Sequence, residues 1–433
     1  MFTAARIFAV AALILGIASS AGAQGLPLAK TPEEVGLSSE RLKRLTAGLK
    51  NDVEKGAIPG AVVLIARKGK VAYFEAIGFQ DRENKIPMAG NSIFRIASMT
   101  KPFTSLAVMM LAEEGKIQLP YPVSRYLPEF KDLKVGVEKK DEATGKMDLL
   151  LEPARREMTV QDLLRHTSGL TYGIFGKSMV KDRYNAIGAF DYHNTNAEMV
   201  TKLSQVPLQY HPGTTWEYSM STDVLGRIVE VISGLELDAF IAERILKPLK
   251  LADTGFWVEG EKRQARMAEQ QVDPATGKRP PMTDLTKRPK WMSGGGGMVS
   301  TAPDYARFCQ MLLNGGSLYG IRLVSRKTID LMTSNHLPPG IHYGPLVPIQ
   351  FAGISPTPEE GGGFGLGFGV RMEAGRSPLP GSVGDYCWAG AYGTYFWIDP
   401  QEKLIVVKMM QAPALRLHYR YLLRHYVYQA IVD

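Results

Sequence analysis

The sequence predicts an α+β fold, in which an antiparallel β-sheet is flanked by helices and a mostly helical subdomain is inserted between its strands. Residues 60–66 and 71–78 are rich in residues typical of strands, and Lys68-Gly69-Lys70 between them is a hairpin signal. Further strand-like runs lie near the other end of the chain, at residues 385–388, 394–398 and 404–410. Because residues 120–290 are mainly helical in pattern, we expect a sheet built from both ends of the chain around a helical insertion.

Helical periodicity flanks these strand-like runs. Residues 33–53 predict an amphipathic helix with Ser39 as its N-cap, and residues 415–431 predict a closing helix. Residues 364–370 alternate as a strand does, and residues 345–363 hold several prolines and glycines that are typical of a long surface insertion.

The first residues indicate export. Arg6 is followed by an apolar run and then by Ser19-Ser20-Ala21-Gly22-Ala23, which predicts a signal peptide over residues 1–23 that is cleaved after Ala23. The run is too short to favour the alternative, a membrane anchor. We expect a periplasmic or secreted protein with one domain over residues 24–433. Its sheet subdomain would cover about 24–97 and 291–433, and its helical subdomain about 98–290.

Composition argues against several classes of function. The net charge is +8, but the lysines and arginines are scattered among acids, so nucleic-acid binding is not indicated. The histidines and cysteines lack metal-ligand spacing, so we expect no metal site. Cys309 and Cys387 lie in apolar surroundings and are expected to be buried thiols, although a disulfide between them stays open. No later segment has the length of a transmembrane helix.

A Ser-x-x-Lys tetrad, Ser98 to Lys101, begins a strongly apolar helical run. Spacing of three along a helix places the serine hydroxyl and the lysine amine on one face, one turn apart. A lysine kept neutral by its surroundings can take the serine proton, which makes the serine a nucleophile without a histidine. Pro102 fits only a first turn, so Ser98 is expected at a helix N-terminus, where N–H groups favour negative charge. The alternative is a serine that only caps the helix.

Two other segments contain residues of catalytic type, but their surroundings predict a structural role. The tetrad recurs at Ser178 to Lys181, where glycines and a charged run predict a solvated loop. His166 and Ser168 suggest a catalytic pair, but the chain has no Gly-x-Ser-x-Gly elbow, so His166 is expected to hydrogen-bond loop backbone. The short helix before it is predicted to be capped by Thr159 with Asp162.

Taken in order, these segments and two later ones resemble the serine β-lactamase and penicillin-binding-protein superfamily. The segments on which the resemblance rests are Ser98-Met99-Thr100-Lys101, His166-Thr167-Ser168-Gly169-Leu170, Pro212-Gly213-Thr214-Thr215-Trp216-Glu217-Tyr218-Ser219 and the stretch 294–302. Within the superfamily the chain is most similar to the class C β-lactamase-like carboxylesterases called family VIII. The resemblance covers essentially the whole mature chain.

The resemblance implies that Tyr218 is the tyrosine of the family's Tyr-x-Asn element, because it follows Trp216 and precedes an apolar helix. The literal match at Tyr192-His193-Asn194 lacks this setting. Met220 replaces the asparagine that meets a β-lactam's side-chain amide, and a thioether cannot make a comparable hydrogen bond.

The family's Lys-Thr-Gly strand has no literal counterpart in this chain. Trp388-Ala389-Gly390-Ala391 is similar to the Trp-x-Gly form of these esterases, whereas His342-Tyr343-Gly344 comes too early. Loss of that lysine removes a cation that β-lactamases present to the drug's carboxylate, and Trp388 offers an apolar face. With Met220, the residues Trp388, Ala389 and Gly390 would bind an ester.

The resemblance therefore implies a serine hydrolase that cleaves short-chain carboxylic esters without a cofactor, with weak β-lactamase activity allowed. Ser98 would form an acyl-enzyme, Lys101 and Tyr218 would be general base and acid, and the N–H groups of Ser98 and Ala391 would form the oxyanion hole. A class C-type β-lactamase, a DD-peptidase and an acyltransferase remain alternatives. A non-catalytic binding protein is disfavoured by the intact Ser98, Lys101 and Tyr218, and the oligomeric state stays open.

Overall fold

The main element of the molecule is an antiparallel sheet, as expected. The computed structural model describes residues 25–273, 276–280 and 282–433, so the predicted signal peptide lies outside the described residues. Within these ranges the main sheet has 8 strands in the order β12-β13-β14-β15-β16-β1-β2-β3, and each neighbouring pair is antiparallel. The strands are β1 (Gly60–Arg67), β2 (Lys70–Asp81), β3 (Ile86–Pro87), β12 (Gly362–Phe364), β13 (Gly369–Arg371), β14 (Tyr386–Ala389), β15 (Tyr395–Asp399) and β16 (Leu404–Met410).

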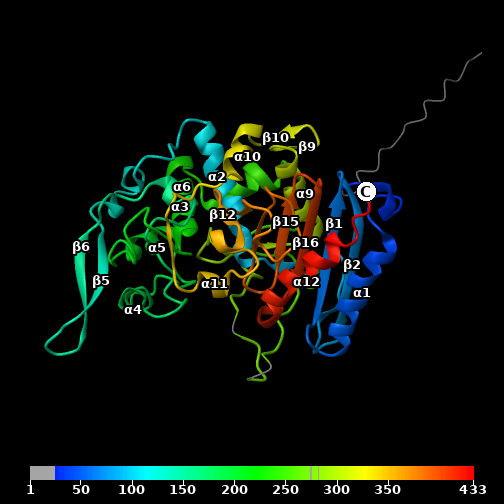
Figure 1. Ribbon diagram of the computed structural model, residues 1–433, viewed down its shortest axis with the longest axis horizontal. Coiled ribbons are helices and arrows are strands. Elements are labelled where there is room, and N and C mark those ends of the chain that lie inside the picture. Colours follow the sequence, from blue (N-terminus) through cyan, green and yellow to red (C-terminus); the bar gives the residue numbers. More distant parts are fainter. Residues whose placement is uncertain (1–24, 274–275, 281) are drawn as a thin grey trace, which may run out of the picture.

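The two ends of the chain meet in the middle of this sheet. Strand β1 pairs with β2 on one side and with β16 on the other (Figure 1). The turn between β1 and β2 lies at Lys68 and Gly69, both at positive φ, where the hairpin signal was read. The predicted α+β fold is confirmed, and so is the prediction that strands from both ends of the chain build the sheet.

Helices cover both faces of the sheet, which explains why every residue of β1 and β16 is buried. Tyr395 of β15 accepts a hydrogen bond from Arg424 of α12 (Arg416–Tyr428), while the next residue, Phe396, contacts Tyr305 of α9 (Ala302–Leu313). Successive side chains of a strand point to opposite faces, so α12 and α9 lie on opposite sides. Helix α1 (Ser39–Glu54) packs against α12 and β2. Its N-cap is Ser38 and not the predicted Ser39, and the predicted start of this helix at residue 33 lies in a separate 3-10 turn, Pro32–Val35.

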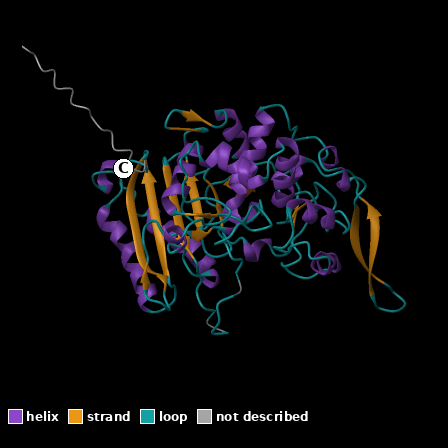
Figure 2. Cartoon of the chain, turned by 180° about the vertical axis from the view of Figure 1, so that it is seen from behind, coloured by secondary structure: helices purple, strands orange, loops and turns teal. Residues whose placement is uncertain are grey.

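A largely helical region lies beside the main sheet (Figure 2). Its centre is α2 (Lys101–Glu113), which packs against α6 (Ser221–Ser233). The other α-helices among the residues described are α3 (Val160–Leu164), α4 (Met179–Ala186), α5 (Asn196–Leu203), α7 (Leu237–Ile241), α8 (Glu261–Gln264), α10 (Arg326–Met332) and α11 (Val347–Gln350). The short strands outside the main sheet are β4 (Phe94–Arg95) with β8 (Val299–Ser300), β7 (Thr215–Trp216) with β11 (His342–Tyr343), and β9 (Ser317–Leu318) with β10 (Ile321–Arg322).

One feature of the predicted helical subdomain is a hairpin. Strands β5 (Lys134–Lys140) and β6 (Met147–Pro153) pair with each other and project away from the helices (Figure 1). Charged residues at both strands conceal the usual alternation of apolar and polar positions, so the sequence pattern gave no strand signal here.

The run 364–370 is two strands rather than one, which corrects the prediction. Strands β12 and β13 are joined by a turn in which Gly365 N donates to Phe368 O. Gly367 has φ +104, a conformation that an L side chain rarely adopts. Alternating glycines therefore gave the appearance of a continuous strand across a turn.

The segment around Ser178 is a helix and not a solvated loop. Ser178 is the N-cap of α4, and its Oγ accepts from Lys181 N. The lysine is buried because its ammonium pairs with Glu217 at 3.0 Å. The charge run was therefore misleading, since a buried carboxylate allows a charged side chain to face the core.

The cysteines are as the sequence suggested: Cys309 and Cys387 are both free and buried. In the part of the chain that the structure describes, no helix is long and apolar enough to cross a bilayer. Over the same residues, no group of three or more His, Cys, Asp or Glu side chains is placed to hold a metal ion.

Candidate active site

Ser98 lies in a 3-10 turn, Ala97–Thr100, that runs directly into α2. Ala97 has φ +44, a strained conformation for a non-glycine residue, and Ser98 itself is partly exposed. The turn after β14 packs against this strained segment, because Thr394 Oγ1 donates to Ile96 O at 3.2 Å. A Cβ on Gly390 would lie 2.4 Å from the same oxygen, so only glycine permits this approach. The candidate nucleophile is thus held rigidly between α2 and the sheet.

Lys101 is buried beneath Ser98, with 1% of its surface exposed. Its Nζ donates to the carbonyl oxygen of Gly295 at 2.8 Å, to Tyr172 Oη at 3.3 Å and to Ser98 Oγ at 3.5 Å. The predicted serine–lysine pair is therefore brought together, at a separation that a small side-chain shift brings into proton-transfer range. The glycine stretch 294–297 serves for close packing, because a Cβ on Gly295 would lie 2.4 Å from Asp223 Oδ2.

Behind Lys101 lies a buried network that sequence reasoning missed. Tyr172 Oη donates to Asp223 Oδ2 at 3.3 Å, and Asp223 Oδ1 accepts from Ser293 Oγ at 2.5 Å and from Gly295 N at 3.0 Å. Burial, reinforced by the Asp223 charge, raises the pKa of Tyr172 well above its ordinary value, so this phenol stays protonated. Since its proton is directed to Asp223, its lone pair faces Lys101.

Opposing effects act on the ionisation of Asp223 in this network. Burial raises the pKa of Asp223, whereas the Lys101 charge and the donors around the carboxylate lower it. One signal could have revealed this residue: Asp223 is a lone acid at the start of the apolar helix α6. Tyr172 could have been noticed because it lies two residues after the His166–Leu170 segment.

Tyr218 lies beside Lys101, as predicted, but contacts it through the face of its ring. Lys101 Nζ is 4.5 Å from the centroid of the Tyr218 ring, while the hydroxyl that the lysine contacts belongs to Tyr172. The Tyr218 hydroxyl is buried and has no hydrogen-bond partner among the residues described. Unpaired buried hydroxyls are rare, which makes this one a candidate substrate contact.

The other predicted binding residues line the same region. Trp388 is buried in β14, its ring centroid lies 5.6 Å from that of Tyr218, and its Nε1 has no partner among the described side chains and backbone. Ala389 and Gly390 continue toward the turn, Ala391 is exposed within it, and Met220 is fully buried at the start of α6. His342, by contrast, lies in β11 beside β7, outside the main sheet.

The segment 345–363 is not only a surface insertion. It carries Phe351, which is buried, stacks on Trp388 at 5.6 Å and contacts the Tyr218 ring at 4.9 Å. Proline and glycine content gave no sign of this contact, because a single aromatic residue in an irregular segment has no periodicity. Phe351 therefore forms part of the apolar wall of the candidate site.

His166 supports the site from below and does not form a catalytic pair with Ser168. Its Nδ1 lies 3.2 Å from Ser219 Oγ, its ring centroid lies 4.9 Å from that of Tyr218, and burial lowers its pKa well below the usual value. Its backbone oxygen accepts from Glu217 N, while its ring bonds a serine side chain rather than the loop backbone that was expected. Ser168 Oγ is 2.7 Å from Ser221 Oγ instead.

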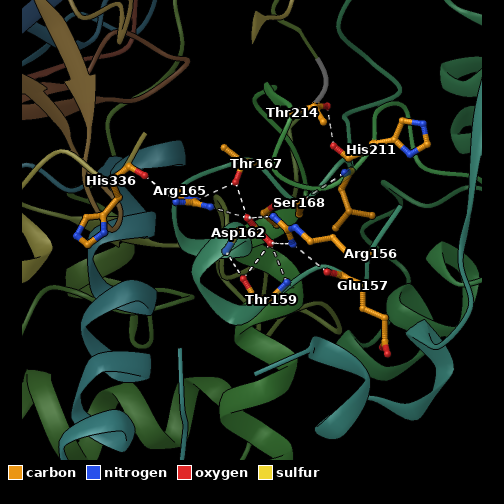
Figure 3. Close-up of polar contacts among 12 residues, drawn as sticks. Arg156, Glu157, Thr159, Asp162, Arg165, Thr167, Ser168, His211, Thr214 and His336 are labelled. Carbon is orange, nitrogen blue, oxygen red and sulfur yellow. Dashed lines mark hydrogen bonds and ion pairs between the residues drawn. The ribbon is translucent and has the colours of Figure 1, made fainter. Parts of the chain in front are cut away.

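Asp162 anchors the loop that carries His166 (Figure 3). Its buried carboxylate accepts from Arg156, Arg165 and Thr167, and with Thr159 it forms the predicted capping box. Burial alone would raise the pKa of Asp162, but the Arg156 guanidinium and the other donors bring it to about 2.

The chain is similar to known proteins over most of its length. The family model described as Beta-lactamase matches residues 45–423. Esterase EstB of Burkholderia gladioli is 30% identical over 364 residues, which cover 82% of this chain and 86% of that protein. Protein Rv1367c of Mycobacterium tuberculosis (strain ATCC 25618 / H37Rv) is 34% identical over 373 residues, covering 84% and 88%.

Two solved structures are similar over nearly the whole chain. EstCE1, a hydrolase with promiscuous acyltransferase activity, has a TM-score of 0.74 at 27% identity and covers 90% of this chain and 99% of its own. Unliganded simvastatin synthase (LovD) from Aspergillus terreus has a TM-score of 0.74 at 25% identity, covering 90% and 98%.

Proposed function

This chain belongs to the β-lactamase family, and from that premise we propose that it hydrolyses short-chain carboxylic esters through an acyl-enzyme on Ser98. The observation that carries the proposal is the set of contacts between Lys101 Nζ and Ser98 Oγ, Tyr172 Oη and Gly295 O. They hold the amine in one place beneath a partly exposed hydroxyl. The similarity to an esterase over most of both chains gives further support.

The first half-reaction forms the acyl-enzyme. In the reactive form Lys101 is a neutral amine, whose Nζ donates to Gly295 O and Tyr172 Oη and has its lone pair directed to Ser98. Ser98 Oγ bonds to the ester carbonyl carbon while its proton passes to this Nζ, which accepts it as general base. The negative charge on the former carbonyl oxygen is stabilised by the N–H groups of Ser98 and Ala391, typically by about 3 kcal/mol for each donor. The carbon–oxygen bond to the alcohol then breaks, and the alcohol leaves with the proton from Lys101.

The second half-reaction returns the free enzyme. Water attacks the acyl carbon, gives a proton to the Lys101 and Tyr218 pair, and releases a carboxylic acid as Ser98 Oγ regains its proton. The unpartnered Tyr218 hydroxyl is free to contact either the leaving alcohol or this water. No cofactor takes part in either step.

Esters suit the binding residues better than β-lactams do. Met220 offers no amide to a β-lactam side chain, and Trp388 brings an aromatic face where that family of enzymes uses a lysine. Together with Phe351, these residues form an apolar surface for a short acyl chain. The activity expected toward β-lactams is therefore weak.

A second candidate is acyl transfer to an alcohol. The similarity to EstCE1, described as a hydrolase with promiscuous acyltransferase activity, and to a simvastatin synthase favours it. Adding a small alcohol to the assay distinguishes the two: transfer gives a new ester, whereas hydrolysis gives only free acid.

The direct test is hydrolysis of p-nitrophenyl esters of increasing chain length, with nitrocefin as the β-lactam, by wild type, Ser98→Ala and Ser178→Ala. Ser178 provides a matched control because it begins the other Ser-x-x-Lys tetrad. We expect short-chain activity that only Ser98→Ala abolishes. Equal rates in wild type and Ser98→Ala would refute the proposal.

A further inference from the structure

A pocket adjoins the turn that carries Ser98 and plays no part in the chemistry described so far. It is lined by Arg95, Tyr192, Trp291, Gly296, Met298 and Tyr392. Gly296 directly follows Gly295, which accepts from Lys101, and Tyr392 directly follows Ala391 in the turn after β14. Arg95 itself ends β4, just before the strained turn that carries Ser98. A Cβ on Gly296 would lie 3.8 Å from the carbonyl carbon of Ala97, so this side of the pocket adjoins the turn that carries Ser98.

Arg95 is the only part of this lining that carries a positive charge, and its hydrogen bonding is incomplete. Its Nη2 donates to Thr283 O at 3.3 Å, and its Nε is buried without a partner in the described part of the chain. Over the same residues no carboxylate lies within 4.0 Å of its guanidinium, the limit for an ion pair. A planar guanidinium with free donors is suited to bind a carboxylate through two parallel hydrogen bonds.

The carboxylates nearest to Arg95 are already bonded elsewhere. Glu269 and Asp284 attract its charge only from a distance. Glu269 pairs with Arg279 at 3.3 Å, and Asp284 accepts from Thr286 N and Thr286 Oγ1. Burial lowers the pKa of Arg95, as expected for a cation whose counter-charge is incomplete.

Apart from Thr283, the rest of the lining is aromatic or apolar. The Tyr192 and Trp291 rings lie 5.6 Å apart, and burial raises the pKa of Tyr392, so its hydroxyl stays protonated and can donate. Methylene groups can pack on these rings while a terminal anion reaches the guanidinium. The pocket thus combines a positive charge with an apolar surface, which suits a substrate that has both an anionic group and methylene groups.

From this arrangement we infer that the preferred substrate is an ester that carries a carboxylate a few bonds from the ester group, and that Arg95 binds this carboxylate. The inference rests on the proposed esterase function and names its substrate class. The carboxylate can belong to the acyl chain, as in a monoester of a dicarboxylic acid, or to the alcohol, and both fit the same recognition by Arg95.

The test compares charged and neutral esters of matched shape. On the acyl side, monoethyl succinate, glutarate and adipate are compared with ethyl butanoate, pentanoate and hexanoate, and on the alcohol side 4-carboxyphenyl butanoate is compared with phenyl butanoate. The readout is the ratio of kcat/KM for each charged ester to that of its neutral partner. We expect this ratio to be at least about tenfold in wild type on one of the two sides, and to fall with added salt.

Variants then assign the preference to Arg95. Arg95→Gln should lower the ratio by about tenfold to a hundredfold, and Arg95→Lys should keep part of it because the charge remains. Lys287→Gln removes an exposed positive charge that does not line the pocket, and should leave the ratio unchanged. If Arg95→Gln does not fold, the wild-type ratio, its salt dependence and Arg95→Lys still decide.

Two results would overturn the inference while leaving the esterase proposal intact. One is Ser98-dependent hydrolysis with no preference for the charged ester on either side. The other is a preference that Arg95→Gln does not reduce. Absence of any Ser98-dependent hydrolysis would overturn both proposals together.

Discussion

Two of the lysines buried in this protein, Lys101 and Lys408, have sharply different surroundings. Lys101 is 1% exposed and its Nζ contacts Gly295 O, Tyr172 Oη and Ser98 Oγ. Lys408 of β16 is 0% exposed, yet its Nζ has no hydrogen-bond partner among the described residues. Its nearest favourable contact is the Tyr419 ring, with the centroid 5.0 Å away.

The comparison teaches that burial of a titratable group does not by itself indicate a catalytic site. Burial, with the neighbouring Arg420 charge, lowers the pKa of Lys408 well below its ordinary value, so the fold favours the neutral form of this amine. Nothing it touches could exchange a proton with a substrate. Lys101 differs because a partly exposed hydroxyl lies within its reach.

The largest expected effect is on catalysis and comes from replacing Lys101, with the same replacement at Lys408 as its control. Lys101→Met should lower kcat/KM for a short-chain ester by about 10²- to 10⁴-fold, because general base catalysis is lost. Lys408→Met, an equally buried change, should leave kcat/KM close to that of wild type. Steady-state kinetics on both purified variants check this, and comparable losses in the two would end the distinction drawn between them.

Asp162 extends the comparison to a buried charge that is fully paired. Asp162→Asn should reduce the free energy of unfolding by about 3 kcal/mol, because it leaves Arg156 and Arg165 without their carboxylate. Since folding lowers the pKa of Asp162 from 3.8 to about 2, its charge stabilises the protein fully above about pH 4, by about 2 kcal/mol. That contribution is lost as the pH falls from about 4 toward 2.

Urea unfolding between pH 3 and pH 7 measures both terms for Asp162. The difference between wild type and Asp162→Asn should shrink as the pH falls. A difference that stays constant with pH would assign the effect to lost packing instead of charge.

Lys408 should give a smaller effect of opposite sign. Because folding lowers the pKa of Lys408, the unfolded chain binds a proton at this lysine more tightly than the folded chain does, so stability rises with pH toward 10.5. Lys408→Met removes this cost and should raise the free energy of unfolding by about 1–3 kcal/mol at pH 7. The gain should be smaller at pH 9.5, and a variant less stable than wild type at pH 7 would contradict the interpretation.

The smallest expected effect concerns the orientation of Lys101. Tyr172→Phe removes the oxygen that accepts from Lys101 and leaves Asp223 with one donor fewer, so kcat should fall by about tenfold with little change in KM. Tyr428→Phe is the matched control, because its hydroxyl also donates to an aspartate, Asp399, but lies outside the site. Equal kinetics in Tyr172→Phe and wild type would remove Tyr172 from the positioning network.

The features that the sequence predicted correctly are those that depend on a local pattern of residues. The start of α2 at the Ser98 tetrad, the hairpin at Lys68 and Gly69, and the capping box of Thr159 and Asp162 all follow from residue types a few positions apart. The assembly of the sheet from both ends followed from the order of these elements. These features needed no knowledge of tertiary contacts.

What the sequence could not supply depends on contacts between distant segments. Tyr172, Asp223 and Gly295 come from separate elements and meet only around Lys101. Phe351 reaches the site from an irregular segment, and Arg95 can be recognised as unpaired only when all its neighbours are known. The turn between β12 and β13 was hidden because its glycines continued the alternation of the strands.

The central claim is that Ser98 carries the acyl group during turnover. Acid quenching of the protein during hydrolysis of p-nitrophenyl butanoate, followed by peptide mass spectrometry, tests it most directly. The account predicts one butanoyl group on the peptide that contains Ser98, absent from Ser98→Ala and present in Ser178→Ala. An acyl group on another residue, or turnover by Ser98→Ala with no adduct on Ser98, would contradict it.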